Sequence, residues 1–142
     1  MPEDLKALQW VALGSNVFNA MIPVYPGVDK MPEYLSKAYV KPTTENFYWV
    51  NRIIGALADA HFYENQSNIE RYQLSVDRKL YEMIRKFDQE FQEKEPEDKK
   101  AFFEAANQEI SDFIQEKTTE LLDKVLFTSS CLMRNGFSRS DA

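Results

Sequence analysis

The chain has 142 residues, which is the length of a single domain that can bury a core without a disulfide or a metal. Hydrophobic residues make up 44% and charged residues 28%, while glycine occurs only 4 times, which argues against a turn-rich all-β domain. The formal net charge of -6 disfavours nucleic acid and anionic lipid as partners, because phosphates attract clustered lysine and arginine. Cys131 is the single cysteine, so no intrachain disulfide can form, and we expect a reducing, cytoplasmic compartment. No apolar run approaches the roughly 20 residues that cross a bilayer, and the acidic start Met1-Pro2-Glu3-Asp4 is unlike a signal peptide.

Two apolar stretches near the start predict a short antiparallel β-hairpin over residues 5–25. Residues 5–13 are apolar on both faces of the predicted strand, which implies that both faces are covered. Pro23 lies in the second stretch and favours an edge or irregular strand. Residues 26–42 hold several prolines and no sustained periodicity, so we expect an ordered loop.

A first helix is predicted over residues 44–62, with Thr43 or Thr44 as its N-terminal cap. Its apolar residues occur on nearly every side, so it should be the most buried helix.

Two longer helices are predicted over residues 65–94 and 96–127, each with one apolar stripe at three- and four-residue steps. Pro96 fits the first position of the second of these helices, and the short break makes the pair an antiparallel hairpin. About 30 residues at 1.5 Å each give a length of about 45 Å, so the shape should be elongated. Residues 128–142 should form a polar, frayed tail.

These elements predict one α+β domain over residues 1–142, in which a short antiparallel β-hairpin precedes three helices and the last two form a long antiparallel helical hairpin.

Residues that can carry chemistry are few. His61 is the only histidine and falls at a helix end, where a structural role at the negative end of the dipole is favoured over acid-base catalysis. Cys131 follows the last helix without a base or a helix N-terminus beside it, so a buried or idle thiol is favoured over a nucleophile. One cysteine and one histidine seventy residues apart match no zinc spacing, and we expect no metal and no cofactor.

Two weaker candidates complete this set. Pro2 would carry a free secondary amine after removal of Met1, but it leads into a solvated acidic segment and not into a buried strand. Trp49, Arg52 and Asp59 share one face of the first helix and suit a cation-π contact and an indirect ion pair. We expect these three to tie the helix to its neighbours.

Four stretches of the sequence resemble a known family in their order and spacing. They are Gln9-Trp10-Val11-Ala12-Leu13-Gly14, Ile22-Pro23-Val24-Tyr25-Pro26-Gly27-Val28, Asn46-Phe47-Tyr48-Trp49-Val50-Asn51-Arg52 and Ala56-Leu57-Ala58-Asp59-Ala60-His61. Together with Ile69-Glu70-Arg71-Tyr72-Gln73 they resemble the C-terminal part of the dipeptidase A family, cysteine peptidases of the N-terminal-nucleophile hydrolase superfamily.

The resemblance implies a fragment of a cytoplasmic enzyme that cleaves dipeptides on a four-layered αββα sandwich. Family members use a cysteine near the start of the chain, whose own α-amino group acts as the base. Here Cys131 lies at the wrong end, so the resemblance transfers no catalytic residue and we expect the chain to be inactive alone. The expected partners are the missing N-terminal portion of the dipeptidase or a second copy, with a dipeptide bound only by the complete enzyme. The alternative is a non-catalytic helical module for interaction or oligomerisation.

Overall fold

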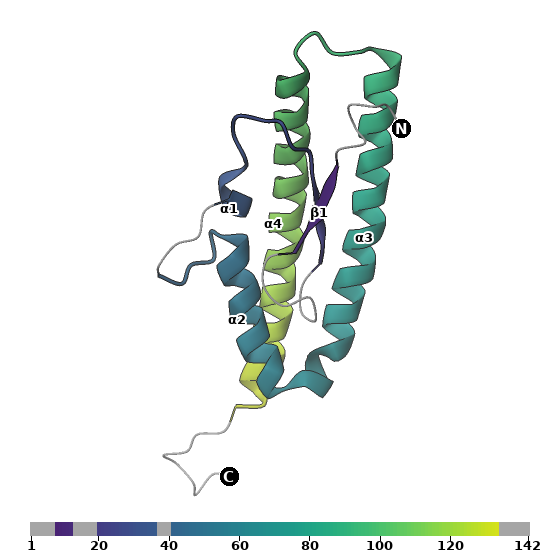
Figure 1. The fold of residues 1–142 in the computed structure, drawn as a ribbon. Helices are drawn as coiled ribbons and strands as arrows, with labels where there is room; N and C mark the ends of the chain where they lie inside the picture. The colour runs from purple at the N-terminus through teal and green to yellow at the C-terminus, as the bar shows by residue number, and fades with distance from the viewer. Residues whose placement is uncertain (1–7, 13–19, 37–40, 134–142) are drawn as a thin grey trace, which may run out of the picture.

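A computed structural model of the protein describes residues 8–12, 20–36 and 41–133. The described residues form a two-stranded antiparallel sheet and four helices, which confirms the predicted α+β class (Figure 1). The elements are β1 (Gln9–Val11), β2 (Ile22–Val24), α1 (Glu33–Ser36), α2 (Phe47–Ala60), α3 (Phe62–Glu93) and α4 (Lys99–Cys131).

The hairpin pairs Trp10 with Pro23, flanked by the pairs of Gln9 with Val24 and of Val11 with Ile22. The predicted hairpin over residues 5–25 lies partly outside the described residues, and within the described ones each strand is three residues long. Proline cannot donate to a ladder, and Pro23 is accommodated because β2 has a strand on one side only among the described residues. The inner strand is β2, which is mostly buried and contacts α4, while β1 lies outside it.

The predicted loop over residues 26–42 contains one helical turn, so the prediction of an entirely irregular segment is wrong. In α1 the carbonyl of Pro32 accepts hydrogen bonds from the backbone N–H groups of Leu35 and Ser36, both at 3.1 Å. Proline is tolerated directly before a helix because the N–H group that it lacks has no partner within the helix there. Tyr34 of this turn is buried in the core.

The helix α2 begins later than predicted and has a different cap. The side chain of Asn46 accepts a hydrogen bond from the backbone N–H of Trp49 at 3.3 Å, whereas the hydroxyl of Thr43 accepts one from Glu45 in a local turn. The helix is also less covered than predicted, since Arg52 and Asp59 lie on an exposed face. Its buried stripe consists of Phe47, Val50, Asn51, Ile54 and Ala58.

The long helices α3 and α4 lie side by side and antiparallel, which confirms the predicted helical hairpin (Figure 1). Pro96 lies in the connection and not in α4, because Asp98 caps that helix by accepting a hydrogen bond from Ala101 N–H at 3.0 Å. The helix continues to Cys131, so residues 128–131 of the predicted tail are helical.

The core follows the seam where α2 and α3 both pack against α4. Its fully buried residues include Val76 and Leu80 from α3 and Ile110 and Ile114 from α4. Removing such side chains from water stabilises the fold by about 1.5–3 kcal/mol each.

Candidate functional site

The β-hairpin is attached to α4 through one asparagine side chain. The backbone N–H of Tyr25, directly after β2, donates to Oδ1 of Asn107 at 2.9 Å, and Nδ2 of Asn107 donates to the carbonyl of Tyr25 at 2.9 Å. Asn107 is 1% exposed, so both hydrogen bonds are shielded from water. The side-chain amide of Asn107 thus forms with Tyr25 the two hydrogen bonds that a neighbouring strand would otherwise form.

Aromatic packing holds the side chain of Tyr25 in the same place. Its ring stacks on Phe103 at a centroid distance of 5.3 Å and meets Phe87 edge-on at 6.1 Å. Burial raises the pKa of the Tyr25 hydroxyl, and the nearby charge of Asp88 raises it further. Neither the Tyr25 hydroxyl nor Oδ1 of Asp88 has a hydrogen-bond partner within the described part of the chain.

The loop that follows Tyr25 is attached to the same face of α4. One carboxylate oxygen of Glu104 accepts from the backbone N–H groups of Asp29 at 3.1 Å and Lys30 at 3.3 Å. Lys100 pairs with the carboxylate of Asp29 at 3.3 Å. Steps of four and three residues place Lys100, Glu104 and Asn107 on one helix face. We call the contact between these three residues and residues 25–30 the hairpin seat.

Gly27 allows the chain to turn between Tyr25 and Asp29. Its φ of 78° lies in the left-handed region, which side chains with a Cβ rarely adopt. The chain can therefore turn within two residues of Tyr25 and bring Asp29 to α4.

The outer strand of the hairpin remains open to solvent. Gln9 and Val11 of β1 are exposed, and the structure pairs β1 with no strand other than β2 over residues 8–12, 20–36 and 41–133. Trp10, between them, packs on Tyr81 of α3 at a centroid distance of 5.2 Å. An unpaired strand edge of this kind presents N–H and C=O groups to which a further strand can bind.

A second polar contact lies where α2 passes into α3. Nδ2 of Asn65 donates to the carbonyl of His61 at 3.0 Å and to the hydroxyl of Ser129 at 3.2 Å, and that hydroxyl donates to the carbonyl of Leu57 at 3.4 Å. This network connects the end of α4 to the turn between the other two helices.

The structure places His61 in this turn as the cap of both α2 and α3. Its backbone N–H donates to Ala58 and its carbonyl accepts from Asn65, whereas its imidazole makes no capping hydrogen bond. Cys131 is exposed at the last position of α4, so the expectation of a thiol beyond the helix is wrong. No hydrogen bond joins the imidazole to the thiol in the part of the chain that the structure describes.

The expected cation-π contact on α2 is present. The guanidinium carbon of Arg52 lies 5.2 Å from the ring centroid of Trp49 and 5.7 Å from that of Tyr48, whose hydroxyl also accepts a hydrogen bond from Arg52 at 3.0 Å. Asp59 is exposed further along the helix, and no ion pair between it and Arg52 is seen among the described residues. All these groups belong to α2 itself, so they brace that helix. Pro2 lies outside the described residues.

The described residues contain neither a metal-binding cluster nor a membrane-spanning helix. Across residues 8–12, 20–36 and 41–133, no three His, Cys, Asp or Glu side chains come together as a metal site requires. None of the helices in these ranges combines the length and apolar character that a membrane crossing demands.

The sequence pattern alone does not identify the residues of the hairpin seat. One sign was present, since Asn107 lies on the apolar stripe between Ala106 and Ile110, and asparagine is unfavourable inside a helix. A polar residue at such a position requires hydrogen-bond partners. Those partners lie 82 positions away, so the sequence does not reveal them.

Comparison with known proteins places the chain in a family. The sequence profile of peptidase family C69 matches residues 1–75, which is more than half of the chain and includes the hairpin, α1, α2 and the start of α3. This chain belongs to peptidase family C69.

Individual relatives extend the similarity over almost the whole chain. "Probable dipeptidase A" of Streptococcus pyogenes is 38% identical over 140 residues, covering 99% of this chain and 29% of the relative. "Dipeptidase" of Bifidobacterium longum is 33% identical over 178 residues, and "Dipeptidase A" of Lactobacillus helveticus is 29% identical over 136 residues. The chain therefore spans 29% of the length of the Streptococcus pyogenes relative.

Proposed function

We propose that this polypeptide is the C-terminal region of a cytoplasmic dipeptidase of the cysteine, N-terminal-nucleophile type. In that enzyme it supplies framework, and the nucleophile comes from the remaining portion of the protein. The proposal rests on the family membership and on the names of the relatives.

The structural observation that supports a framework role within a larger protein is the open outer edge of the hairpin. The hairpin is fixed on its inner side by the hairpin seat, and its outer strand β1 exposes Gln9 and Val11 without a neighbour other than β2 in the described structure. A two-stranded hairpin is marginally stable by itself, and a sheet of more strands is the usual arrangement. The remaining portion of the dipeptidase would extend the sheet at β1, on the outer side of the hairpin.

The chemistry of the chain supports a framework role. His61 and Cys131 form no hydrogen-bonded pair in the described structure, and a catalytic nucleophile requires a base within hydrogen-bond reach. The chain alone should therefore not hydrolyse dipeptides. A dipeptide would bind only in the completed enzyme.

Reconstitution tests this proposal. The chain would be co-expressed with the portion of the Streptococcus pyogenes relative that lies outside the matched region, and dipeptide hydrolysis would be measured for each part and for the mixture. Activity of the mixture alone is the expected result. Hydrolysis by the chain alone that disappears in Cys131→Ser would contradict the proposal, because Cys131 would then be a nucleophile.

Site-directed variants test whether the remaining portion of the dipeptidase binds at β1. Val11→Lys places a charge on the exposed strand and should weaken reconstitution without unfolding the chain, since Val11 is 36% exposed. Phe127→Lys, at a 71% exposed position near the end of α4, is the matched control and should reconstitute normally.

A second candidate is a self-associating helical module. Tyr63 at the start of α3, Phe127 near the end of α4 and Met133 just beyond α4 are 87%, 71% and 76% exposed, and these two helix ends lie together in the fold (Figure 1). Large exposed apolar side chains are typical of interaction surfaces. Sedimentation analysis would show a concentration-dependent dimer that Phe127→Lys abolishes and Val11→Lys leaves intact. A monomer at all concentrations would exclude this candidate.

A further inference from the structure

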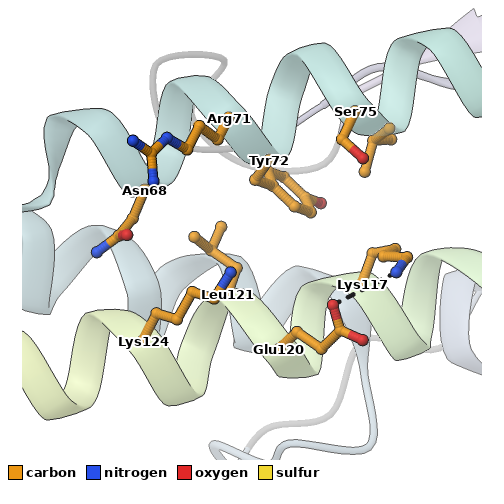
Figure 2. Close-up of a pocket in the computed structure, with 9 residues that line it drawn as sticks. Asn68, Arg71, Tyr72, Ser75, Lys117, Glu120, Leu121 and Lys124 are labelled. Atoms are coloured by element: carbon orange, nitrogen blue, oxygen red, sulfur yellow. Dashed lines mark hydrogen bonds and ion pairs between the residues drawn. The ribbon is translucent and has the colours of Figure 1, made fainter.

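A cleft lies between α3 and α4 (Figure 2), and none of the residues that line it belongs to the hairpin seat. Its volume is about 220 Å³, which far exceeds the roughly 10–15 Å³ that one water molecule requires. Asn68, Arg71 and Tyr72 of α3 face Lys117, Glu120 and Lys124 of α4 across it. From Asn107 to Lys117 is ten residues, hence about 15 Å along α4 at 1.5 Å per residue.

The charge of the cleft is opposite to that of the chain. Arg71, Lys117 and Lys124 line it together with one carboxylate, that of Glu120, while the whole chain carries a net charge of -6. Glu120 is engaged by Lys117 at 3.4 Å. Arg71 and Lys124 form no ion pair in the part of the chain that the structure describes, so two positive charges remain uncompensated at the cleft.

The positive groups come from both helices. Arg71 belongs to α3, whereas Lys117 and Lys124 extend from α4 toward α3 (Figure 2). The ring of Tyr72 points from α3 into the space between the two lysines (Figure 2). Lys117 and Lys124 are seven residues apart on one face, hence about 10 Å along the helix. A ligand in the cleft can therefore be approached by cations from two sides.

The floor of the cleft is formed by buried side chains that are held in place by packing and a hydrogen bond. Tyr72 is 8% exposed and its hydroxyl shares a hydrogen bond of 3.0 Å with the hydroxyl of Thr118, which joins α3 to α4. Leu121 is 2% exposed and completes the floor from α4. Burial raises the pKa of Tyr72 to about 12, so its hydroxyl stays neutral at physiological pH. Asn68 and Ser75 add neutral polar groups at the rim.

We propose that this cleft binds a small oxyanion that carries two or more negative charges. Uncompensated cations on both walls and uncharged donors at the rim match the several acceptor oxygens of a phosphate-type or polycarboxylate ligand. A single-charge anion would leave one of the two free cations uncompensated. The inference does not rest on the dipeptidase assignment.

Calorimetric titration of the purified chain with sodium pyrophosphate, and separately with sodium citrate, tests the proposal at low ionic strength and neutral pH. One ligand per chain should bind, and added salt should weaken binding because the contacts are electrostatic. Saturation with pyrophosphate alone would identify a phosphate-type ligand, and saturation with citrate alone a carboxylate-type ligand. Absence of saturable binding to both would overturn the proposal.

A charge-matched pair of variants separates a site from diffuse attraction. Arg71→Gln with Lys124→Gln removes both uncompensated cations, whereas Arg85→Gln with Lys94→Gln removes two exposed cations outside the cleft. The first variant should weaken binding at least about tenfold, and the second should change it less than about twofold. Equal weakening by the two variants would also overturn the proposal. Circular dichroism would verify that both variants remain helical.

Discussion

The side-chain amide of Asn107 bonds both backbone polar groups of Tyr25, with each hydrogen bond 2.9 Å long. This relationship links the middle of α4 to the strand at the other end of the sequence, 82 positions away. Because Asn107 is buried, water cannot replace either hydrogen bond. The position of the hairpin on α4 therefore depends on this side chain as well as on the packing of the Tyr25 ring.

Replacing Asn107 by alanine should release the hairpin. Tyr25 would lose partners for its buried N–H and C=O groups, at a cost of about 1–3 kcal/mol for each unsatisfied group. Hydrogen exchange of the Tyr25 amide should accelerate, and urea unfolding should show the loss of stability. Asn107→Asp can still accept from the N–H but cannot donate to the carbonyl when ionised, so it should also destabilise the chain. The exposed neighbour Gln108→Ala provides the control and should leave Tyr25 exchange unchanged.

Asp88 should make the chain less stable as the pH rises through the acid range. Burial raises the pKa of this carboxyl in the folded state, so the folded chain holds the proton to a higher pH than the unfolded chain does. The stabilisation that protonated Asp88 gives is complete below the pKa of Asp88 in the unfolded chain. It is lost as the pH rises through the pKa of Asp88 in the folded chain.

Asp88→Asn should therefore stabilise the chain at neutral pH and reduce the pH dependence of its unfolding midpoint. Asp123→Asn changes an exposed carboxyl on α4 and serves as the control. A lower midpoint for Asp88→Asn at neutral pH would show that the ionised carboxylate has a favourable partner.

The Asn65 network should couple the end of α4 to the turn between α2 and α3. Asn65→Ala removes the donor to Ser129 and one of the donors to the His61 carbonyl, and the expected cost is about 1–3 kcal/mol. Ser129→Ala should cost less than Asn65→Ala. A double-mutant cycle should give a coupling energy of at least about 0.5 kcal/mol. The exposed Ser130→Ala is the control, and additivity of the first two changes would contradict the network.

The ion pair between Lys86 of α3 and Glu109 of α4 should contribute little despite its short distance of 2.6 Å. Its side chains are 50% and 48% exposed, and exposed pairs contribute about 0.2–1 kcal/mol. The hydrogen bond from Lys86 to Glu109 raises the pKa of Lys86, so the contribution is present below the ordinary lysine pKa and is lost as the pH rises above the folded value.

A double-mutant cycle with Lys86→Met and Glu109→Met should measure this coupling. It should shrink in 1 M salt, where the screening length is about 3 Å. A coupling above about 2 kcal/mol that salt does not change would contradict the prediction.

The long helices could be predicted from the sequence, because helix formation depends on residues that are close together in the chain. The stripe that includes Val76 and Leu80 on α3 and Ile110 and Ile114 on α4 predicts two long helices, since a period of 3.6 residues places such side chains on one face. Helix starts were less predictable. Asn46 caps α2 in place of Thr43 or Thr44, because several residues near a helix start can accept the same backbone N–H groups.

By itself the sequence determined the hairpin, the three longer helices, their order and the similarity to a dipeptidase family, because periodicity and motif spacing are properties of the linear chain. The tertiary structure alone decided where the hairpin sits, that Asn107 holds it, and that Arg71 and Lys124 meet across one cleft. The residues brought together in these two places are 53 and 82 positions apart in the sequence. Asn107 and Lys124 both lie on α4, and nothing in the sequence shows which residues of the other elements they meet. Their geometry arises only when packing of the apolar seam fixes the rotation and the offset of α3 against α4.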